Sequence, residues 1–375
     1  MVTIAYTHDG SNEYDLLFLK SLSKKHRVYF LTFNSDSRFV PKETVVVKLP
    51  GSVSASGKAE GFYMYAFSLL RAVLLGWYLR RIKPDIVLGC LATKYGFYSA
   101  LSGFKPFILI IWGSDILIAP QRFFLLRVMA KFTINKADAV IVDSKVQETA
   151  AIRLGCDPKK ILRFPWFDVK SMRIRRSKSE IRKQLGWRDN PIVISLRRHE
   201  PIYRVKFLIE AIPHIVAEVP DCRFLILGSG SLHEKLKRRV NELKVEQYVK
   251  FLGQVPVDEV ATYLNAADVY VSTSASDGTS ASLLEAMTFG IAPVVTSIPG
   301  NREWVENGRN GYLVPVGDSQ RLAEKITWLI KNENIRLRIG KNATKCVNAK
   351  VDWRKNLKAL GNLIFSLVNK YGREG

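Results

Sequence analysis

Short apolar runs alternate with longer segments of helical periodicity along almost the whole chain. Apolar runs bounded by Gly, Pro or small polar residues are typical of buried strands, and strands that alternate with helices are typical of parallel sheets covered on both faces. The pattern therefore predicts an α/β protein. The predicted strands cover residues 2–6, 28–33, 86–89, 107–111, 139–142, 191–196, 223–227, 249–252, 269–272, 293–296 and 312–314.

The alternation is interrupted near the middle of the chain. A segment rich in aromatic residues, 164–168, precedes a basic stretch at 170–183, and we place an interdomain linker near residues 166–180. The length of 375 residues suits two domains that each bury a core. The expected parts are a first domain at 1–168, a second domain at 180–350 and an amphipathic helix at 351–375.

The chain carries a large excess of positive charge, with 57 Lys and Arg against 34 Asp and Glu and a formal net charge of +23. Such an excess attracts polyanions, which include nucleic acid, anionic lipid and phosphorylated substrates. The sequence has no helix-turn-helix, zinc-finger or aromatic RNA-binding signature, so we do not expect nucleic acid as a partner.

Two predicted helices, near residues 62–81 and 121–132, mix bulky apolar residues with Arg and Lys. Helices of this composition lie in a membrane interface, with the apolar face down and the basic side chains against lipid phosphates. The first helix is nearly long enough for a transmembrane span, and both helices also suit buried crossovers between parallel strands. We expect peripheral contact with an anionic membrane, with buried crossovers and a true span as the alternatives.

Residues 277–285 read Asp-Gly-Thr-Ser-Ala-Ser-Leu-Leu-Glu and lie between two predicted strands. The small residues at 278–282 let a ligand approach the backbone, and the start of the following helix offers unpaired N–H groups to an anion. An acidic residue one or two turns into that helix suits the two hydroxyls of a ribose. The pattern indicates a nucleoside diphosphate linked to another group, and an ordinary crossover with a Ser N-cap is the alternative.

The segment from Asp277 to Thr296 resembles the acidic-x7-Glu signature of the retaining glycosyltransferases of family 4. This family has the GT-B fold, in which two Rossmann-like domains face a central cleft and a carboxy-terminal helix crosses back to the first domain. The similarity is close over residues 137–330 and weaker, but collinear, over the amino-terminal third. The other matching blocks, in the order of the family, are Ser195-Leu-Arg-Arg198, Leu208-Ile-Glu-Ala211, Phe224-Leu-Ile-Leu-Gly228-Ser-Gly230, Val249-Lys-Phe-Leu-Gly253-Gln-Val255 and Gly308-Arg-Asn-Gly311.

The resemblance implies roles for residues of the second domain, which would bind a nucleotide sugar. Glu285 would bind the ribose, Arg198 the diphosphate, and Asp277 the hydroxyls of the sugar. The family usually has Glu at the position of Asp277 and Lys at that of Tyr203, so donor specificity and the second positive charge are open; Arg204, Lys206 or the Tyr203 hydroxyl could supply the latter. Further residues implied to contact the donor are Gly228, Gly230, Val255, Gly278, Thr279, Ser280 and Ser282.

The first domain would bind the acceptor. Gly10 follows the first predicted strand at the carboxyl edge of the sheet, where α/β proteins bind ligands, and should face the acceptor or the diphosphate. Many relatives carry His where this chain has Trp112, so we assign no catalytic histidine, and Asp115 is the acceptor-side candidate. His8 and His199 follow predicted strands and could line the cleft, although exposed loop positions are the main expectation.

We expect no metal ion and no cofactor beyond the donor, a UDP- or GDP-linked sugar. The chain contains no Asp-x-Asp clamp and no histidine pair at metal-ligand spacing. The leaving diphosphate would be neutralised by Arg198, its basic neighbours and a helix amino terminus. In the mechanism that the resemblance implies, the acceptor hydroxyl attacks from the face that the diphosphate leaves, and the anomeric configuration is retained.

The predicted protein is a glycosyltransferase that builds a lipid-linked or surface glycan at the cytoplasmic face of a membrane. The four cysteines are scattered, and residues 1–6 have the pattern of a first strand rather than a signal peptide, so a cytoplasmic location is expected. Two alternatives remain: an epimerase or hydrolase of the same fold that acts on a nucleotide sugar without an acceptor, and a non-catalytic module that binds polyanions.

Overall fold

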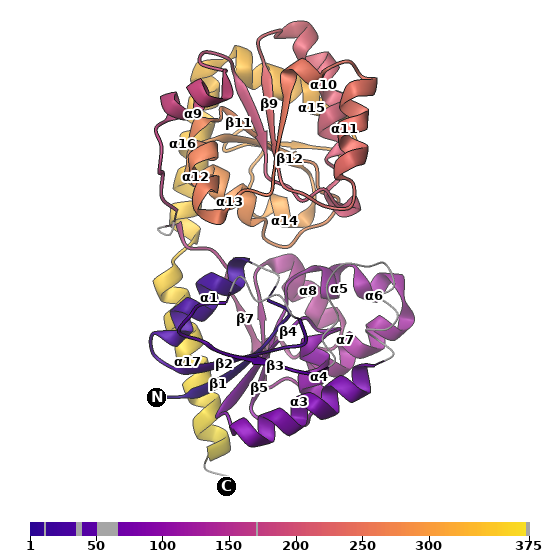
Figure 1. The fold of residues 1–375 in the computed structure, drawn as a ribbon, viewed down its shortest axis with the longest axis vertical. Coiled ribbons are helices and arrows are strands. Elements are labelled where there is room, and N and C mark those ends of the chain that lie inside the picture. The colour runs from indigo at the N-terminus through magenta and orange to yellow at the C-terminus, as the bar shows by residue number, and fades with distance from the viewer. Residues whose placement is uncertain (11–12, 35–39, 51–66, 170–171, 373–375) are drawn as a thin grey trace. The chain divides into compact units, whose positions relative to one another are not determined.

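A computed structural model describes residues 1–10, 13–34, 40–50, 67–169 and 172–372 of the chain (Figure 1). The chain divides into two compact units, each with its own sheet and cores. Unit 1 consists of Met1–Trp166 together with Trp353–Gly375, and unit 2 consists of Phe167–Asp352.

Unit 1 is built on a parallel sheet whose described strands number seven, with the order β3-β2-β1-β4-β5-β6-β7. One core lies under helices α3, α4 and α7, and the other lies under α1 and α17 on the opposite face. The strands are β1 (Thr3–Thr7), β2 (Arg27–Thr32), β3 (Val45–Lys48), β4 (Ile86–Cys90), β5 (Phe107–Ile110), β6 (Ala139–Val142) and β7 (Ile161–Arg163). The helices are α1 (Glu13–Ser23), α3 (Ser68–Ile82), α4 (Tyr95–Leu101), α5 (Ser114–Leu117), α6 (Ala119–Arg122), α7 (Phe124–Lys136), α8 (Lys145–Arg153), the 3-10 turn η1 (Pro158–Lys160) and α17 (Trp353–Gly372).

Unit 2 has a second parallel sheet, with six described strands in the order β10-β9-β8-β11-β12-β13. The strands are β8 (Ile192–Ser195), β9 (Arg223–Leu227), β10 (Val249–Gly253), β11 (Val269–Ser272), β12 (Ala292–Thr296) and β13 (Tyr312–Val314). The helices are α9 (Lys178–Leu185), η3 (Pro201–Tyr203), α10 (Lys206–Glu218), α11 (His233–Glu242), η4 (Glu246–Tyr248), α12 (Val257–Ala266), α13 (Ala281–Thr288), α14 (Pro299–Arg302), α15 (Ser319–Lys331) and α16 (Glu333–Lys350). Two cores, one on each face, bury the central strands completely.

Both sheets share one topology. In each unit the first strand lies in the interior of the sheet, the next two strands extend to one side, and the later strands extend to the other. The strand order therefore reverses between β1 and β4 in unit 1 and between β8 and β11 in unit 2. Ligands of open α/β sheets bind at such switch points, beyond the carboxyl ends of the strands. The topology thus marks one candidate binding position in each unit.

The prediction of two Rossmann-like parallel sheets is confirmed, and all the predicted strands are present within a residue or two of their expected ends. Two edge strands, β3 and β7, were not predicted. β3 has only a three-residue apolar run, Val45-Val46-Val47, and β7 contains only three residues, so both are short. The carboxy-terminal helix α17 belongs to unit 1, where Trp353, Leu360 and Ile364 enter the core that also contains β1.

The two basic apolar helices differ from their predicted bounds. The first, α3, begins at Ser68, and part of the predicted range lies outside the described residues. The second is broken at Phe123, whose backbone is extended, so the expected helix at 121–132 is two helices, α6 and α7. Among the helices that the structure describes, none combines the length and apolar character needed to cross a bilayer.

Candidate functional site

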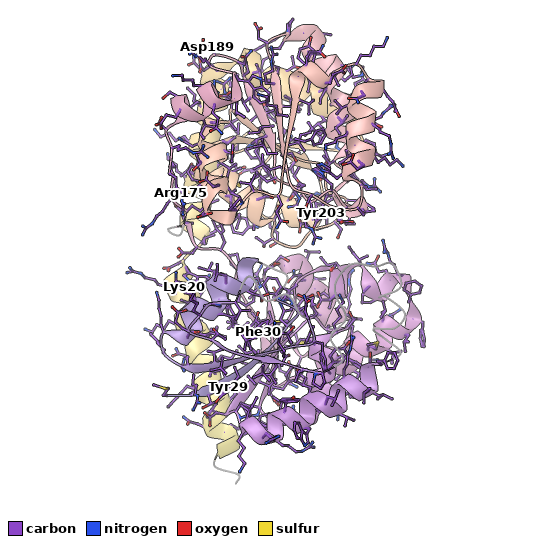
Figure 2. The ribbon with its side chains drawn as sticks, in the orientation of Figure 1. Lys20, Tyr29, Phe30, Arg175, Asp189 and Tyr203 are labelled. Atoms are coloured by element: carbon purple, nitrogen blue, oxygen red, sulfur yellow. The ribbon has the colours of Figure 1, made fainter. Side chains whose placement is uncertain are left out.

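The switch point of unit 2 is surrounded by the loops that follow β8, β9 and β11. The loop after β8 contains residues 196–200 and the turn η3, and the loop after β11 contains residues 273–280. Figure 2 shows Asp189, which precedes β8, and Tyr203, which follows it, at opposite ends of unit 2. Most of the predicted donor residues therefore share the carboxyl edge of this sheet.

Arg197 lies at the centre of this edge, although the sequence argument did not select it. Its Nη2 donates to Asp277 Oδ2 at 2.5 Å, and its Nη1 donates to Ser280 Oγ at 2.7 Å and to Ser282 Oγ at 3.0 Å. The guanidinium also lies over the ring of Tyr203, 4.2 Å from its centroid. One buried cation thus joins both sides of the switch point, and it brings together three of the predicted residues.

The environment of Arg197 keeps it charged. Burial alone would lower the pKa of this guanidinium, but the carboxylate of Asp277 outweighs that effect and the net pKa is raised. Tyr270 extends the network, because its hydroxyl lies 2.7 Å from Ser282 Oγ. Burial raises the pKa of Tyr270, so this hydroxyl stays protonated and available for hydrogen bonding.

The predicted glycine turn after β9 packs directly on the loop after β8. A Cβ atom on Gly228 would lie 2.6 Å from the carbonyl oxygen of Arg197, and one on Gly230 would lie 2.6 Å from that of His199. Gly228 also has a φ of +106°, a backbone conformation that residues with a Cβ atom rarely adopt. Both glycines are therefore required for two loops to approach each other at the switch point.

The second predicted acid, Glu285, lies in the second turn of α13 and is 9% exposed. The helix begins after Ser280, whose side chain accepts a hydrogen bond from Leu283 N and thus forms the N-cap. Gly278 is buried, and a Cβ atom on Gly300 would lie 2.1 Å from its carbonyl oxygen. The start of α14 therefore holds the acidic loop in place from the side of β12.

The remaining donor-side candidates lie at the same edge but in different settings. Arg198 is exposed on the loop after β8, whereas its neighbour Arg197 is buried. Arg204 and Lys206 are exposed, and both have their charged groups near the ring of Phe207. Val255 is partly buried against a hydrophobic core. The binding role of each of these residues stays a prediction.

The expectation that His8 and His199 occupy exposed loop positions is wrong. They are 3% and 0% exposed, respectively. His199 Nδ1 lies 2.8 Å from Nδ1 of His233, and the two rings stack. This pair had no signal in the sequence, because the two residues are 34 positions apart and come together only where α11 begins beside the loop after β8.

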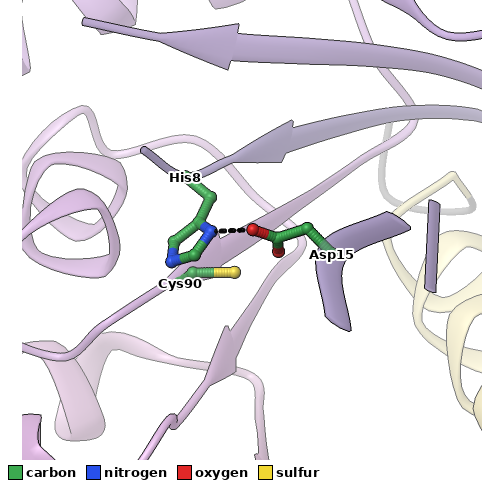
Figure 3. A group of neighbouring side chains, drawn as sticks. All are labelled: His8, Asp15 and Cys90. Carbon is green, nitrogen blue, oxygen red and sulfur yellow. Dashed lines mark hydrogen bonds and ion pairs between the residues drawn. The ribbon is translucent and has the colours of Figure 1, made fainter. Parts of the chain in front are cut away.

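His8 marks the switch point of unit 1, at the end of β1 (Figure 3). Its Nδ1 pairs with Asp15 Oδ2, and Tyr6 donates its hydroxyl to Asp15 Oδ1 at 2.6 Å. Nε2 of His8 faces Asp9 Oδ1 at 3.6 Å. Burial would lower the pKa of His8, but the charges of Asp15 and Asp9 outweigh it and the pKa is raised. The imidazole of His8 and the carboxylate of Asp15 thus form a buried, hydrogen-bonded pair.

Cys90 completes this cluster, since its sulfur and the ligand-type atoms of His8 and Asp15 all lie within 4.8 Å of one another. Such a set of side chains resembles a metal site. However, hydrogen bonds already satisfy Nδ1 of His8 and both oxygens of Asp15. Burial also raises the pKa of Cys90, which keeps the thiol protonated. The geometry is therefore that of a hydrogen-bonded cluster, in which Nδ1 of His8 and both oxygens of Asp15 already have hydrogen-bond partners.

Asp115, the acceptor-side candidate, uses its carboxylate to bind the backbone. It accepts from the N–H groups of Ala92 and Gly113, both at 2.8 Å, and from that of Trp112 at 3.2 Å. It is 3% exposed, and burial raises its pKa although these three bonds act in the opposite direction. Trp112 stacks on His8 with ring centroids 5.4 Å apart. Gly10 is buried at a φ of +71°, in the turn after His8.

The outer faces of α3 and α7 expose a set of large apolar side chains. Both helices pack against α4 on the same face of the sheet. Neither helix contains an acidic residue, and α3 ends with Arg80 and Arg81. The guanidinium of Arg81 lies 4.7 Å from the ring centroid of Trp77. We name these residues the basic apolar face; its apolar members, 45% to 82% exposed, are Phe67, Leu69, Leu70, Val73, Trp77, Phe123, Phe124, Leu125 and Val128.

Two family models match the chain, and together they cover most of both units. Residues 4–144 match the model described as Glycosyl transferase 4-like, and residues 177–346 match the one described as Glycosyl transferases group 1.

Curated proteins from several bacteria are similar to parts of the chain. The chain is 28% identical over 223 residues to the N-acetyl-alpha-D-glucosaminyl L-malate synthase of Bacillus anthracis, which covers 58% of this chain and 57% of that one. It is 29% identical over 197 residues to the GDP-mannose-dependent monoacylated alpha-(1-6)-phosphatidylinositol monomannoside mannosyltransferase of Corynebacterium glutamicum, covering 50% and 51%. The chain thus spans about half the length of the curated relatives it matches.

A solved structure matches over the whole chain. HepE of Anabaena, in complex with UDP and glucose, has a TM-score of 0.79 and 21% identity, and the match covers 98% of this chain and 100% of that one. At this level of identity the likeness shows the GT-B fold.

Proposed function

We propose that this protein transfers a sugar from a nucleotide-diphosphate sugar to a hydroxyl acceptor with retention of configuration. The premise is that the chain belongs to the glycosyl transferases group 1 family. The observation that carries the proposal is the switch point of unit 2. There the acids of the family signature, Asp277 and Glu285, flank the start of α13, beside a glycine turn that admits no side chain.

In this proposal, different donor-side residues contact different parts of the nucleotide sugar. Glu285 takes the ribose hydroxyls, and Asp277 takes hydroxyls of the transferred sugar. Arg198, exposed beside the glycine turn, contacts the diphosphate together with the amino end of α13. Exposed Arg204 and Lys206 supply further positive charge near this edge. A guanidinium aimed at the leaving diphosphate stabilises the negative charge that develops there.

Retention follows if the acceptor attacks from the face that the diphosphate leaves. The bond between the anomeric carbon and the phosphate oxygen breaks, and a bond from that carbon to the acceptor oxygen forms. The acceptor proton passes to the departing phosphate oxygen. This sequence needs neither a protein nucleophile nor a metal ion, and positioning together with charge stabilisation supplies the catalysis.

The acceptor that we propose is a lipid-linked or surface glycan, which the protein reaches by peripheral contact with the cytoplasmic face of an anionic membrane. Support comes from the basic apolar face of unit 1. Scattered single apolar residues on a surface are ordinary, but a helix pair that exposes many of them without any acidic side chain fits a bilayer interface. The mannosyltransferase of Corynebacterium glutamicum also acts, by its name, on a phosphatidylinositol glycolipid.

The test measures donor binding and turnover in the whole chain. Thermal unfolding with UDP-glucose and with GDP-mannose should show which nucleotide raises the midpoint, because a ligand of the folded state stabilises it. With that donor, Glu285→Ala and Arg198→Ala should each lower turnover by about 100-fold in the presence of a membrane lipid extract as acceptor.

Outcomes separate the proposed transfer from its alternatives. Release of free sugar or of an epimerised donor without acceptor would favour a hydrolase or epimerase. Undiminished polyanion binding after both Asp277 and Glu285 are neutralised, with no donor effect at all, would favour a binding module.

A further inference from the structure

Arg–Asp ion pairs join the segments that flank β8 and β11 at both ends of these strands. At the amino ends, Arg182 Nη2 donates to Asp268 Oδ2 at 2.6 Å, and the same carboxylate oxygen accepts from Ile192 N. At the carboxyl ends, Arg197 Nη2 donates to Asp277 Oδ2 at 2.5 Å. Only the second pair lies at the edge where α/β sheets bind ligands.

The two members of the Arg197–Asp277 pair differ in accessibility. The side chain of Arg197 is 8% exposed, whereas that of Asp277 is 19% exposed. Nη1 of Arg197 donates to two serines, and the ring of Tyr203 lies against the guanidinium. Asp277 is therefore the more accessible member of the pair.

We propose that Arg197 is a positioning residue that fixes Asp277 for the sugar moiety of the donor, while Arg198 beside it serves the diphosphate. This inference rests on the proposed function. Arg197 holds one carboxylate oxygen, Oδ2, and leaves Oδ1 to accept hydrogen bonds from sugar hydroxyls.

The same guanidinium ties the carboxylate to the start of α13. Nη2 of Arg197 holds Asp277, while Nη1 donates to Ser280, the N-cap of α13, and to Ser282 in its first turn. Arg197 thereby sets both the reach and the orientation of the carboxylate.

The experiment compares each sugar nucleotide with its own nucleoside diphosphate by isothermal titration calorimetry. The probes are UDP and UDP-glucose, and GDP and GDP-mannose. In Arg197→Gln the affinity for the sugar nucleotide that binds should fall about tenfold, as expected for losing a hydrogen bond to a charged group. The affinity for the matching diphosphate should stay at the wild-type level.

A double-mutant cycle and a matched control complete the test. If Arg197 acts through Asp277, then Arg197→Gln combined with Asp277→Asn should lose no more sugar-nucleotide affinity than either single variant. Arg182→Gln removes an ion pair of the same kind at the opposite edge, and it should lower the melting temperature without changing the ratio of the two affinities. If Arg197→Gln does not fold, Arg197→Lys, which keeps the charge but loses the planar fork, should show an intermediate loss.

Equal losses of affinity for the diphosphate and the sugar nucleotide would overturn the inference, because a purely structural role affects both. Additive losses in the double variant would overturn it as well. If the wild-type protein binds none of the four probes, the proposed function itself fails. If the wild type binds a probe pair but Arg197→Gln loses both affinities equally, only the inference about Arg197 fails.

Discussion

His199 and His233 share a hydrogen bond between their Nδ1 atoms, 2.8 Å apart, and their rings stack with planes 10° apart. One imidazole must donate and the other must accept, so the pair cannot hold a proton on both Nδ1 atoms. Burial and, secondly, the neighbouring His233 lower the pKa of His199 to about 4. The loop after β8 is therefore held by a contact that requires neutral imidazole.

This contact predicts a loss of stability in mild acid. The unfolded chain protonates histidine near pH 6.5, whereas the folded chain keeps His199 neutral down to about pH 4. Between these values the unfolded state binds more protons, so the free energy of unfolding should fall as the pH falls. His199→Asn, which keeps a hydrogen-bonding group but does not titrate, should flatten this dependence in urea unfolding measured at pH 4.5 to 7.

The matched control is His214→Asn, which removes an exposed histidine of α10. It should leave the slope of stability against pH in place. An unchanged slope in the His199→Asn protein would contradict the assignment.

Substitution of glycine by alanine should have opposite effects on stability at two helical positions, one in each unit. A Cβ atom on Gly340, in α16, would lie 1.8 Å from the carbonyl oxygen of Gly290, whereas one on Gly361, in α17, would meet nothing within 4 Å. Gly340→Ala should therefore destabilise the protein by about 1–3 kcal/mol through overpacking. Gly361→Ala should stabilise it by about 0.5–1 kcal/mol, since alanine favours a helix. Chemical denaturation measures both, and a similar sign for the two would refute the packing account.

The basic apolar face predicts association with anionic vesicles. Phe124→Ser and Leu69→Ser should each weaken co-sedimentation with phosphatidylglycerol vesicles, by about 1.5–3 kcal/mol for a fully inserted side chain. Replacement of Arg80, Arg81 and Lys83 by Gln should weaken it by up to about 3 kcal/mol, at roughly 1 kcal/mol each, and added salt should reproduce this loss.

Phe365→Ser is the control for this face, because Phe365 is 62% exposed on α17, away from α3 and α7. Its vesicle binding should equal that of the wild type. Equal binding to neutral vesicles, or binding that Phe124→Ser leaves intact, would argue that the positive charge serves to attract phosphorylated substrates instead.

Metal-free catalysis predicts that transfer continues in excess EDTA. The chain has no Asp-x-Asp clamp, and Arg198 with the amino end of α13 provides positive charge for the leaving diphosphate. Turnover should stay within about twofold of the untreated enzyme, far from the several kcal/mol that loss of a catalytic metal costs. Loss of turnover that Mn²⁺ or Mg²⁺ restores would count against this mechanism.

Much of the fold could be predicted because buried strands such as β8 and β11 are continuous apolar runs between small residues. The edge strand β3 was missed because its apolar run, Val45-Val46-Val47, is only three residues long. The sequence pattern also did not indicate that the helix predicted at 121–132 is interrupted at Phe123. Both flanking segments have helical periodicity, and only an extended backbone at one residue separates them.

The sequence predicted which loops form the candidate site, but not the contacts between their side chains. Asp277, Ser280 and Ser282 were expected at one edge, and the structure joins them through a single guanidinium. The sequence could not identify Arg197 as its source, since two consecutive arginines follow a strand that is buried on both faces and so carries no alternation to show which one turns inward. The contacts of His199 depend on distant segments, which local patterns do not report.

In each unit the cation of an ion pair follows the first strand of the sheet, His8 after β1 and Arg197 after β8, but the two cations differ in kind. Arg197 keeps its charge at any pH that a folded protein survives, whereas His8 can release its proton. The raised pKa of His8 means that its pair with Asp15 contributes its full stability below the unfolded pKa of about 6.5, and that this contribution is lost as the pH rises through the folded pKa. A rise in pH through the folded pKa of His8 should therefore weaken the turn after β1, while Arg197 keeps its charge and the donor-side edge of unit 2 keeps its ion pair.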